Sequence, residues 1–117
     1  MKRELQVSEN CQNRESILNE LKLGYINLED GLFKLAETNF DMVILADPTC
    51  ADAYFGLMLC KYKIRREEAL KSNATLYKDI VKLKEYEKAL KYADETKKAI
   101  YKNLLSEVLK LHEGDNY

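Results

Sequence analysis

The 117-residue chain has no tryptophan, one proline, four glycines and a single histidine, His112. With so little proline and glycine, no stretch marks a domain boundary, and the length fits one hydrophobic core. A single histidine provides neither a His-rich metal site nor a second imidazole for acid–base catalysis. No run reaches the roughly 18 apolar residues of a membrane span, and the first residues lack the apolar stretch of a secretory signal. We therefore expect a cytoplasmic protein without a membrane segment.

Cysteine is also scarce, and its spacing is irregular. Cys11, Cys50 and Cys60 match neither a disulfide framework nor a paired zinc-ligand pattern, so we expect reduced thiols and no metal. Cys60 and His112 form the one thiol–imidazole combination available to a nucleophilic enzyme. The sequence also has no glycine-rich phosphate loop and no His-Glu metal helix. These absences predict a protein without catalytic activity and without a cofactor.

The net charge of −1 hides a difference between the two halves of the chain. Residues 1–60 carry a net charge of −5 and residues 61–117 carry +4. Basic residues cluster in segments 61–66 and 78–91, where they could contact phosphates. Acidic residues interrupt both segments, so solvated helix faces explain the pattern better than nucleic-acid binding, which we keep as a second alternative.

Helical periodicity dominates the chain and predicts an all-α fold. Residues 1–12 are polar and mixed, which favours an irregular or disordered lead-in. A first helix is expected over 13–29, ending at Asp30 and Gly31, because glycine tolerates the left-handed backbone that closes a helix. A second helix is expected over 32–46, ending before Pro48. Residues 13–112 should form one domain, with a tail over 113–117.

The remaining helices are predicted less sharply. Thr49 and Asp52 resemble a capping box that opens a third helix, and this helix should extend to about residue 66. Residues 67–84 predict a short helix followed by a loop. Residues 85–111 contain no proline or glycine, and their apolar residues form one stripe, so we expect a long amphipathic C-terminal helix ending before Gly114. The stripe consists of Tyr86, Ala89, Leu90, Ala93, Ile100, Leu104, Val108 and Leu111.

One segment reproduces the ordered spacing of a known repeat. Its matching residues are Leu23, Gly24, Gly31, Ala36, Phe40 and Pro48. In this register the segment resembles a tetratricopeptide (TPR) repeat, in which two antiparallel helices fill a unit of about 34 residues. The resemblance implies that Gly24 and Ala36 lie where the helices approach most closely and that Phe40 fills the space between them. The chain departs from the consensus at Glu20 and Asn27, which stand at aromatic positions.

A second unit follows and then loses the pattern. Tyr54 and Leu57 match, but Met58 and Arg65 replace the expected glycines. About one and a half TPR-like repeats are therefore expected. Residues 16–100 also look like a TPR-like module of uncharacterised bacterial proteins. That module has no established chemistry, so the resemblance implies a scaffold or adaptor that binds protein.

A TPR-like pair of helices presents residues of its first helix to a concave groove, which could bind a peptide or a helix. The residues expected to contact such a partner are Lys22, Tyr25, Glu29, Phe55, Leu59, Tyr62 and Lys63. The carboxylate-clamp form of the family is disfavoured, because Leu21, Tyr25 and Gly56 occupy three of its donor positions. Two alternatives stay open: the C-terminal helix covers the groove and makes these residues core, or the module self-associates as a homo-oligomer.

Overall fold

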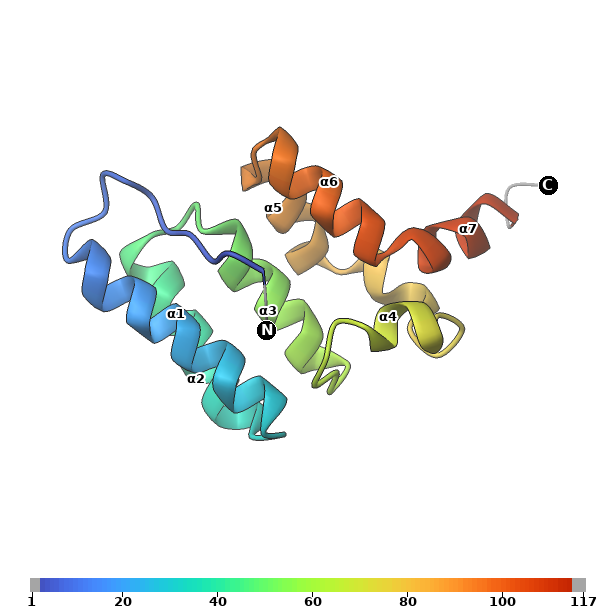
Figure 1. Ribbon diagram of the computed structural model, residues 1–117, viewed down its shortest axis with the longest axis horizontal. Helices are drawn as coiled ribbons and strands as arrows, with labels where there is room; N and C mark the ends of the chain where they lie inside the picture. The colour runs from blue at the N-terminus through green and yellow to red at the C-terminus, as the bar shows by residue number, and fades with distance from the viewer. Residues whose placement is uncertain (1–2, 115–117) are drawn as a thin grey trace.

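The computed structural model describes residues 3–114 and is all-helical, with seven α-helices, one 3-10 helix and no strand in that range (Figure 1). The all-α prediction is confirmed. The molecule measures 48 × 29 × 23 Å along its principal axes, and one cluster of buried side chains runs from Val7 to Val108. The helices are α1 Arg14–Glu29, α2 Phe33–Ala46, α3 Ala51–Lys61, α4 Ala69–Ser72, η1 Lys78–Lys82, α5 Lys84–Tyr92, α6 Glu95–Leu104 and α7 Ser106–Gly114.

The turn between α1 and α2 forms where the glycine predicts it. Gly31 has a φ of 77°, which glycine adopts without the steric cost that a Cβ would add. The amides of Gly31 and Leu32 donate to the carbonyl oxygens of Leu28 and Asn27, closing the C-terminal end of α1. The first two helices begin and end within one or two residues of the predicted bounds.

Phe40 of α2 is wedged against both neighbouring helices. A Cβ added to Gly24 of α1 would stand 2.6 Å from Phe40 Cε1, and one added to Gly56 of α3 would stand 2.6 Å from both Cε atoms. The ring also meets Tyr25 edge to face, with centroids 5.0 Å apart. Two glycines on two helices therefore make the room that one fully buried phenylalanine fills.

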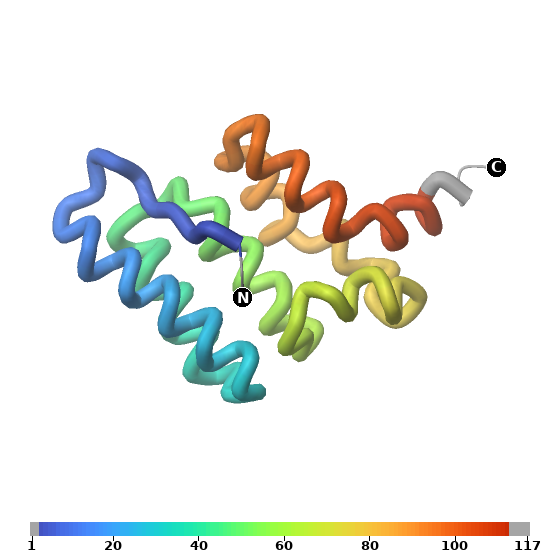
Figure 2. The backbone as a smooth tube through the Cα atoms, in the orientation of Figure 1, coloured from blue at the N-terminus to red at the C-terminus, as the bar shows by residue number. Residues whose placement is uncertain are grey.

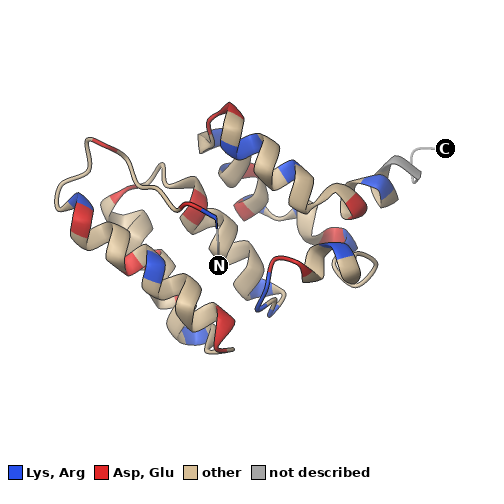
Figure 3. Cartoon of the chain, in the orientation of Figure 1, with Lys and Arg blue, Asp and Glu red and all other residues tan. Residues whose placement is uncertain are grey.

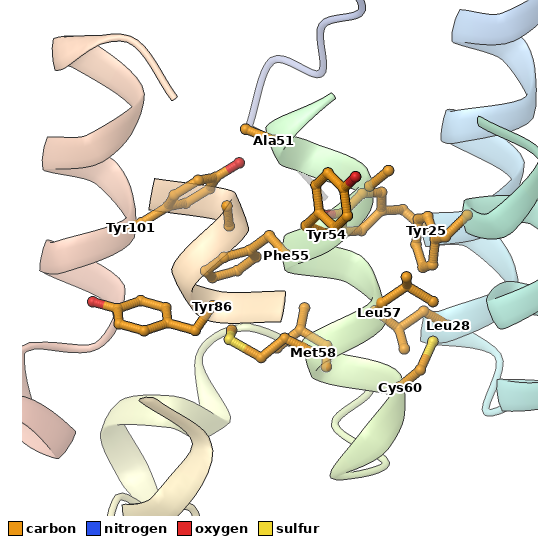
Figure 4. Close-up of a cluster of buried hydrophobic side chains, with 14 of the residues drawn as sticks. Tyr25, Leu28, Ala51, Tyr54, Phe55, Leu57, Met58, Cys60, Tyr86 and Tyr101 are labelled. Carbon is orange, nitrogen blue, oxygen red and sulfur yellow. The ribbon is translucent and has the colours of Figure 1, made fainter. Parts of the chain in front are cut away.

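Helix α3 lies at the centre of the molecule, and its residues Ala51–Cys60 are all buried. Phe55 and Met58 point from one side of α3 toward Tyr86 and Tyr101, while Tyr25 approaches its other side (Figure 4). The expected capping box is not formed. Cys50 is the N-cap of α3, the Thr49 hydroxyl donates to Asp47, and the Asp52 side chain makes long-range contacts instead.

The long C-terminal helix predicted over 85–111 is wrong, because three helices occupy that range. Ala93 adopts an extended conformation (ψ 142°), and the Asp94 side chain accepts a hydrogen bond from the Lys97 amide at 2.8 Å to start α6. A break between two helices can therefore form at an N-cap aspartate, and it needs neither proline nor glycine. A second, smaller break falls at the buried Leu105.

The predicted apolar stripe of this region is correct in part. Tyr86, Ala89, Ala93 and Val108 are buried as predicted, but along α6 the buried residues are Tyr101 and the following Leu105, whereas Ile100 is 36% exposed. Lys97 also lies on the inward face of α6. Because a lysine stands at a buried position, the sequence does not show this face as apolar. Residues 67–84 contain the predicted short helix, which is α4, but the part predicted as a loop includes the 3-10 helix η1.

The N-terminal segment, residues 3–12, is packed rather than disordered, which corrects the expected lead-in. It crosses over α3 between α1 and α6 before α1 begins (Figure 2). Val7 is 6% exposed, and Leu5 packs against the core. The predicted tail over 113–117 begins inside α7 and otherwise lies outside the described residues.

Candidate functional site

A buried polar cluster forms where the N-terminal segment meets α1, α3 and α6. Its charged members are Arg3, Asp52, Glu67 and Lys97, whose side chains are 7%, 0%, 8% and 8% exposed. The hydroxyls of Tyr25 and Tyr101 complete it. We call these six residues the Asp52 cluster.

Asp52, in the first turn of α3, is the common acceptor of the cluster. Its Oδ1 accepts from Arg3 Nη1 and from the Tyr101 hydroxyl, the latter at 2.7 Å. Its Oδ2 accepts from Lys97 Nζ and from the Gln6 amide at 3.0 Å. A carboxylate with no exposed surface is thus held by two cations and two further donors, which is what its burial requires.

Arg3 is the most connected donor of the cluster. Its Nη2 donates to the Tyr25 hydroxyl and to Glu67 Oε1, both at 3.1 Å, and its Nε donates to Glu67 at 3.3 Å. The guanidinium carbon also lies 5.3–5.5 Å from the ring centroids of Tyr25, Phe55 and Tyr101. With Lys97 as the second cation, the two positive charges balance the two carboxylates.

The environment shifts the ionisation of the groups around Asp52. Burial opposes the charge on Arg3, but Tyr25, Asp52 and Glu67 outweigh it and raise the pKa of the guanidinium above its usual value. Burial raises the pKa of the Tyr25 hydroxyl well above its usual value, and burial together with Asp52 raises the pKa of Tyr101. Arg3 therefore stays charged and both tyrosines stay neutral over the physiological range.

The N-terminal segment also binds through its backbone, as an extended peptide would. The amides of Gln6 and Ser8 donate to Asp52 and Asp47, at 3.0 and 2.7 Å. The Glu4 carbonyl accepts from Lys97 Nζ at 3.3 Å, and the Gln6 carbonyl accepts from Cys50 Sγ at 3.4 Å. Every second residue of the segment, at positions 4, 6 and 8, is therefore hydrogen-bonded through its backbone. The partners are side chains of α3, of α6 and of the residues before α3.

Two cavities adjoin Arg3. One of about 650 Å³ is lined by the end of α1, the residues before α4 and the α6 residues Ile100 and Leu104. The other, of about 590 Å³, lies along α1 beside Leu5 and includes Lys22. Arg3 and Glu29 line both, so the N-terminal segment fills only part of the groove between α1 and α6.

The residues expected to contact a partner do not form one open surface. Tyr25, Phe55 and Leu59 are buried, so they are core in this structure, as one of the alternatives anticipated. Part of the cover comes from the C-terminal region, as that alternative expected, because Tyr101 of α6 stacks on Phe55 with centroids 4.2 Å apart. The alternative did not include Arg3 of the N-terminal segment, whose guanidinium carbon lies within 5.5 Å of both ring centroids.

The other four predicted contact residues are divided among three places. Lys22 and Glu29 line the cavities beside Arg3. Tyr62 packs against Tyr77 with centroids 6.1 Å apart, and Lys63 lines a separate cavity beside α2. The structure therefore brings Lys22, Tyr25, Glu29 and Phe55 to the groove and places Leu59, Tyr62 and Lys63 elsewhere.

The sequence reasoning missed Arg3, Asp52, Glu67, Lys97 and Tyr101 as members of a site. Asp52 had a detectable signal, because it is the one charged residue among the ten of the buried run Ala51–Cys60. Charged residues are rarely fully buried unless they are paired, so a partner cation was implied. Nothing in the sequence indicated which cation that would be.

The other candidate chemistries have weaker geometry. Burial, followed by Glu37 and Asp41, raises the pKa of the Cys60 thiol to about 12, which disfavours a reactive thiolate. His112 Nε2 lies 2.5 Å from the Lys78 carbonyl oxygen. Within residues 3–114 no cluster of three or more His, Cys, Asp or Glu residues could hold a metal ion.

The basic segments are interleaved with acidic residues (Figure 3). Lys61 pairs with Glu85 at 3.1 Å, and Arg65 Nε donates to the Glu29 carbonyl at 2.7 Å. In the described part of the chain, no helix has both the length and the apolar character needed to cross a bilayer.

Comparison with known proteins adds no assignment: no family model, no curated protein and no solved structure matches this chain.

Proposed function

We propose that this protein is a non-catalytic scaffold or adaptor module that binds an extended peptide in the groove between α1, α3 and α6. The observation that carries the proposal is the N-terminal segment itself. It runs through this groove as an irregular segment without strand structure, with backbone groups bonded to Asp47, Cys50, Asp52 and Lys97. A groove that holds one segment in this way has the geometry to hold another.

The TPR-like interpretation supports the same proposal. Helices α1, α3 and α6 each contribute one aromatic ring to the groove. These rings belong to Tyr25, Phe55 and Tyr101. In a TPR-like arrangement, α1, α3 and α6 would each be the first helix of a unit. Helices α4 and η1 would then be an insertion in the second unit, between α3 and α5. The groove would then be the concave surface on which such repeats bind partners.

In this proposal the N-terminal segment competes with the partner. Because it is covalently attached, it acts at an effective concentration on the order of millimolar. A partner peptide must therefore bind more tightly than the segment, or the segment must be released first. Weak binding to the wild-type chain and stronger binding after release of the segment are both expected.

The proposal can be tested by selecting peptides from a displayed library against the full-length Arg3→Ala variant. The enriched peptides should lose binding when a synthetic peptide of residues 3–10 is added, since both would occupy the groove. The Arg14→Ala variant, altered at an exposed arginine of α1, is the matched control and should enrich no more than the wild type. If no peptide is enriched, or if the enriched peptides do not compete with residues 3–10, the groove does not bind peptides.

Self-association is the second candidate, and it rests on a different surface. Six of the eight large apolar side chains that are exposed in residues 3–114 lie between Leu23 and Leu45. Leu35, Met42 and Leu45 recur at spacings of seven and three, which places them on one face of α2. Sedimentation velocity over a range of concentrations, with wild type and Leu35→Glu, tests whether this face joins two copies. A wild type that stays monomeric would exclude it.

A further inference from the structure

We propose that the Asp52 cluster is an arginine-recognition site. It binds the guanidinium of an arginine carried by an extended peptide, and Arg3 is an exchangeable occupant belonging to the chain itself. This inference rests on the proposed function and adds the chemistry by which the groove selects its ligand. The partner it predicts is a peptide segment with arginine at one position and an apolar residue four positions later.

The acceptors around Arg3 match a guanidinium rather than an ammonium. Asp52, Glu67 and the Tyr25 hydroxyl receive hydrogen bonds from Nη1, Nε and Nη2, so every nitrogen of the planar group has a partner. A lysine ammonium is a single point of charge and could not reach the three acceptors together. The ammonium of Lys97 already occupies the other oxygen of Asp52, which leaves the guanidinium position distinct.

Three aromatic rings complete the recognition of a flat cation. Phe55 and Tyr101 stack on each other with an interplanar angle of 7°, and Tyr25 lies nearby on α1. All three ring centroids lie 5.3–5.5 Å from the guanidinium carbon, within the range of cation–π attraction. Arginine suits such a site better than lysine, because a guanidinium is planar, forms paired hydrogen bonds and is more weakly hydrated than an ammonium.

Contacts other than those of the arginine also fix the position of the bound segment along the groove. Val7 is buried four residues later, and the amides of Gln6 and Ser8 are bound to Asp52 and Asp47. The side chains of Glu4 and Gln6 are exposed and could be replaced without changing these contacts. The groove therefore recognises an arginine and an apolar residue four positions later, and it tolerates variation at the positions of Glu4 and Gln6, whereas Leu5 packs against the core.

An incoming segment has a route to the site. The cavities of about 650 and 590 Å³ both include Arg3 among their lining residues, so the position of Arg3 borders a cavity on two sides although its side chain is 7% exposed. The negative charge that an arginine would neutralise belongs to Asp52 of α3 and to Glu67, which precedes α4. When Arg3 leaves, these buried carboxylates keep only Lys97 as a cation, and a second arginine restores the balance.

The experiment uses the full-length Arg3→Ala variant and three acetylated peptides. The first has the sequence of residues 3–10, the second has lysine in place of its arginine, and the third has aspartate in place of its valine. Binding is measured by fluorescence anisotropy. We expect the arginine peptide to bind Arg3→Ala at least about tenfold more tightly than either altered peptide. It should bind wild type and Arg14→Ala much more weakly, because their own Arg3 occupies the site.

If Arg3→Ala does not fold alone, the recovery of its helical circular dichroism is titrated with the same peptides. Recovery with the arginine peptide and not with the lysine peptide supports the proposal. Equal effects of the arginine and lysine peptides, or equal binding to Arg3→Ala and Arg14→Ala, overturn it. Library peptides that compete for the groove but lack arginine would refute arginine recognition alone. A failure of every peptide to bind would refute the proposed function as well.

Discussion

Gly56→Ala should destabilise the protein, although alanine is the better helix former. In an open helix the change would contribute about 1 kcal/mol of stability through helix propensity. Here the new methyl group would lie 2.6 Å from two carbon atoms of the Phe40 ring, well inside van der Waals contact. The ring cannot move away freely, because the backbone of Gly24 and the ring of Tyr25 lie against it. Overpacking of this kind costs about 1–3 kcal/mol, and the close contact favours the upper end.

The net loss should therefore be about 1–2 kcal/mol after the propensity gain is subtracted. Urea unfolding followed by circular dichroism measures it, as a shift in midpoint with an unchanged slope. A double-mutant cycle with Phe40→Leu, which removes the ring, should show a favourable coupling of about 1 kcal/mol between the two changes. If Gly56→Ala raises stability as it would in an open helix, Phe40 does not press on α3 and the described packing is incorrect.

Three further predictions concern the Asp52 cluster. Asp52→Asn leaves two buried cations with one carboxylate and should lower the free energy of unfolding by about 3–5 kcal/mol in urea titrations; a loss below about 1 kcal/mol would contradict the described pairing. Cys50 lies under the N-terminal segment, so Arg3→Ala should speed its reaction with a thiol reagent and leave the buried Cys60 unchanged, whereas equal acceleration of both would indicate general unfolding. Burial raises the pKa of Tyr25, so above about pH 10 only the unfolded chain loses this proton and stability falls with pH. Tyr25→Phe should reduce that slope by up to about 1.4 kcal/mol per pH unit, and an unchanged slope would show that Tyr25 ionises in the folded state.

The sequence predicted the first two helices well because their signals are local. Gly31 and Pro48 end helices through backbone geometry that depends on no distant residue. The break after α5 was missed because an aspartate can cap a helix or lie on its exposed face, and the sequence does not distinguish the two. In this structure Asp94 caps α6. The residues of α6 that face the core are therefore not the ones that a continuous helix would place there.

The site was less predictable because its parts are distant in the chain. Arg3 lies in a polar stretch without periodicity, and its partners Asp52 and Glu67 are 49 and 64 residues away. A single arginine in such a stretch looks like an ordinary surface residue. Its burial follows from the fold that places two carboxylates and three rings around it, which no local pattern encodes.

The connection between α3 and α5 has a consequence for how related sequences should vary. It carries Glu67, the second carboxylate that receives Arg3, so a version with a short turn at this point would lack that acceptor. An arginine buried against one shared carboxylate would then be costly, and the N-terminal arginine would no longer be favoured. Homologues should therefore keep the arginine and the glutamate of this connection together or lose both, and this covariation would identify the groove better than the helix pattern does.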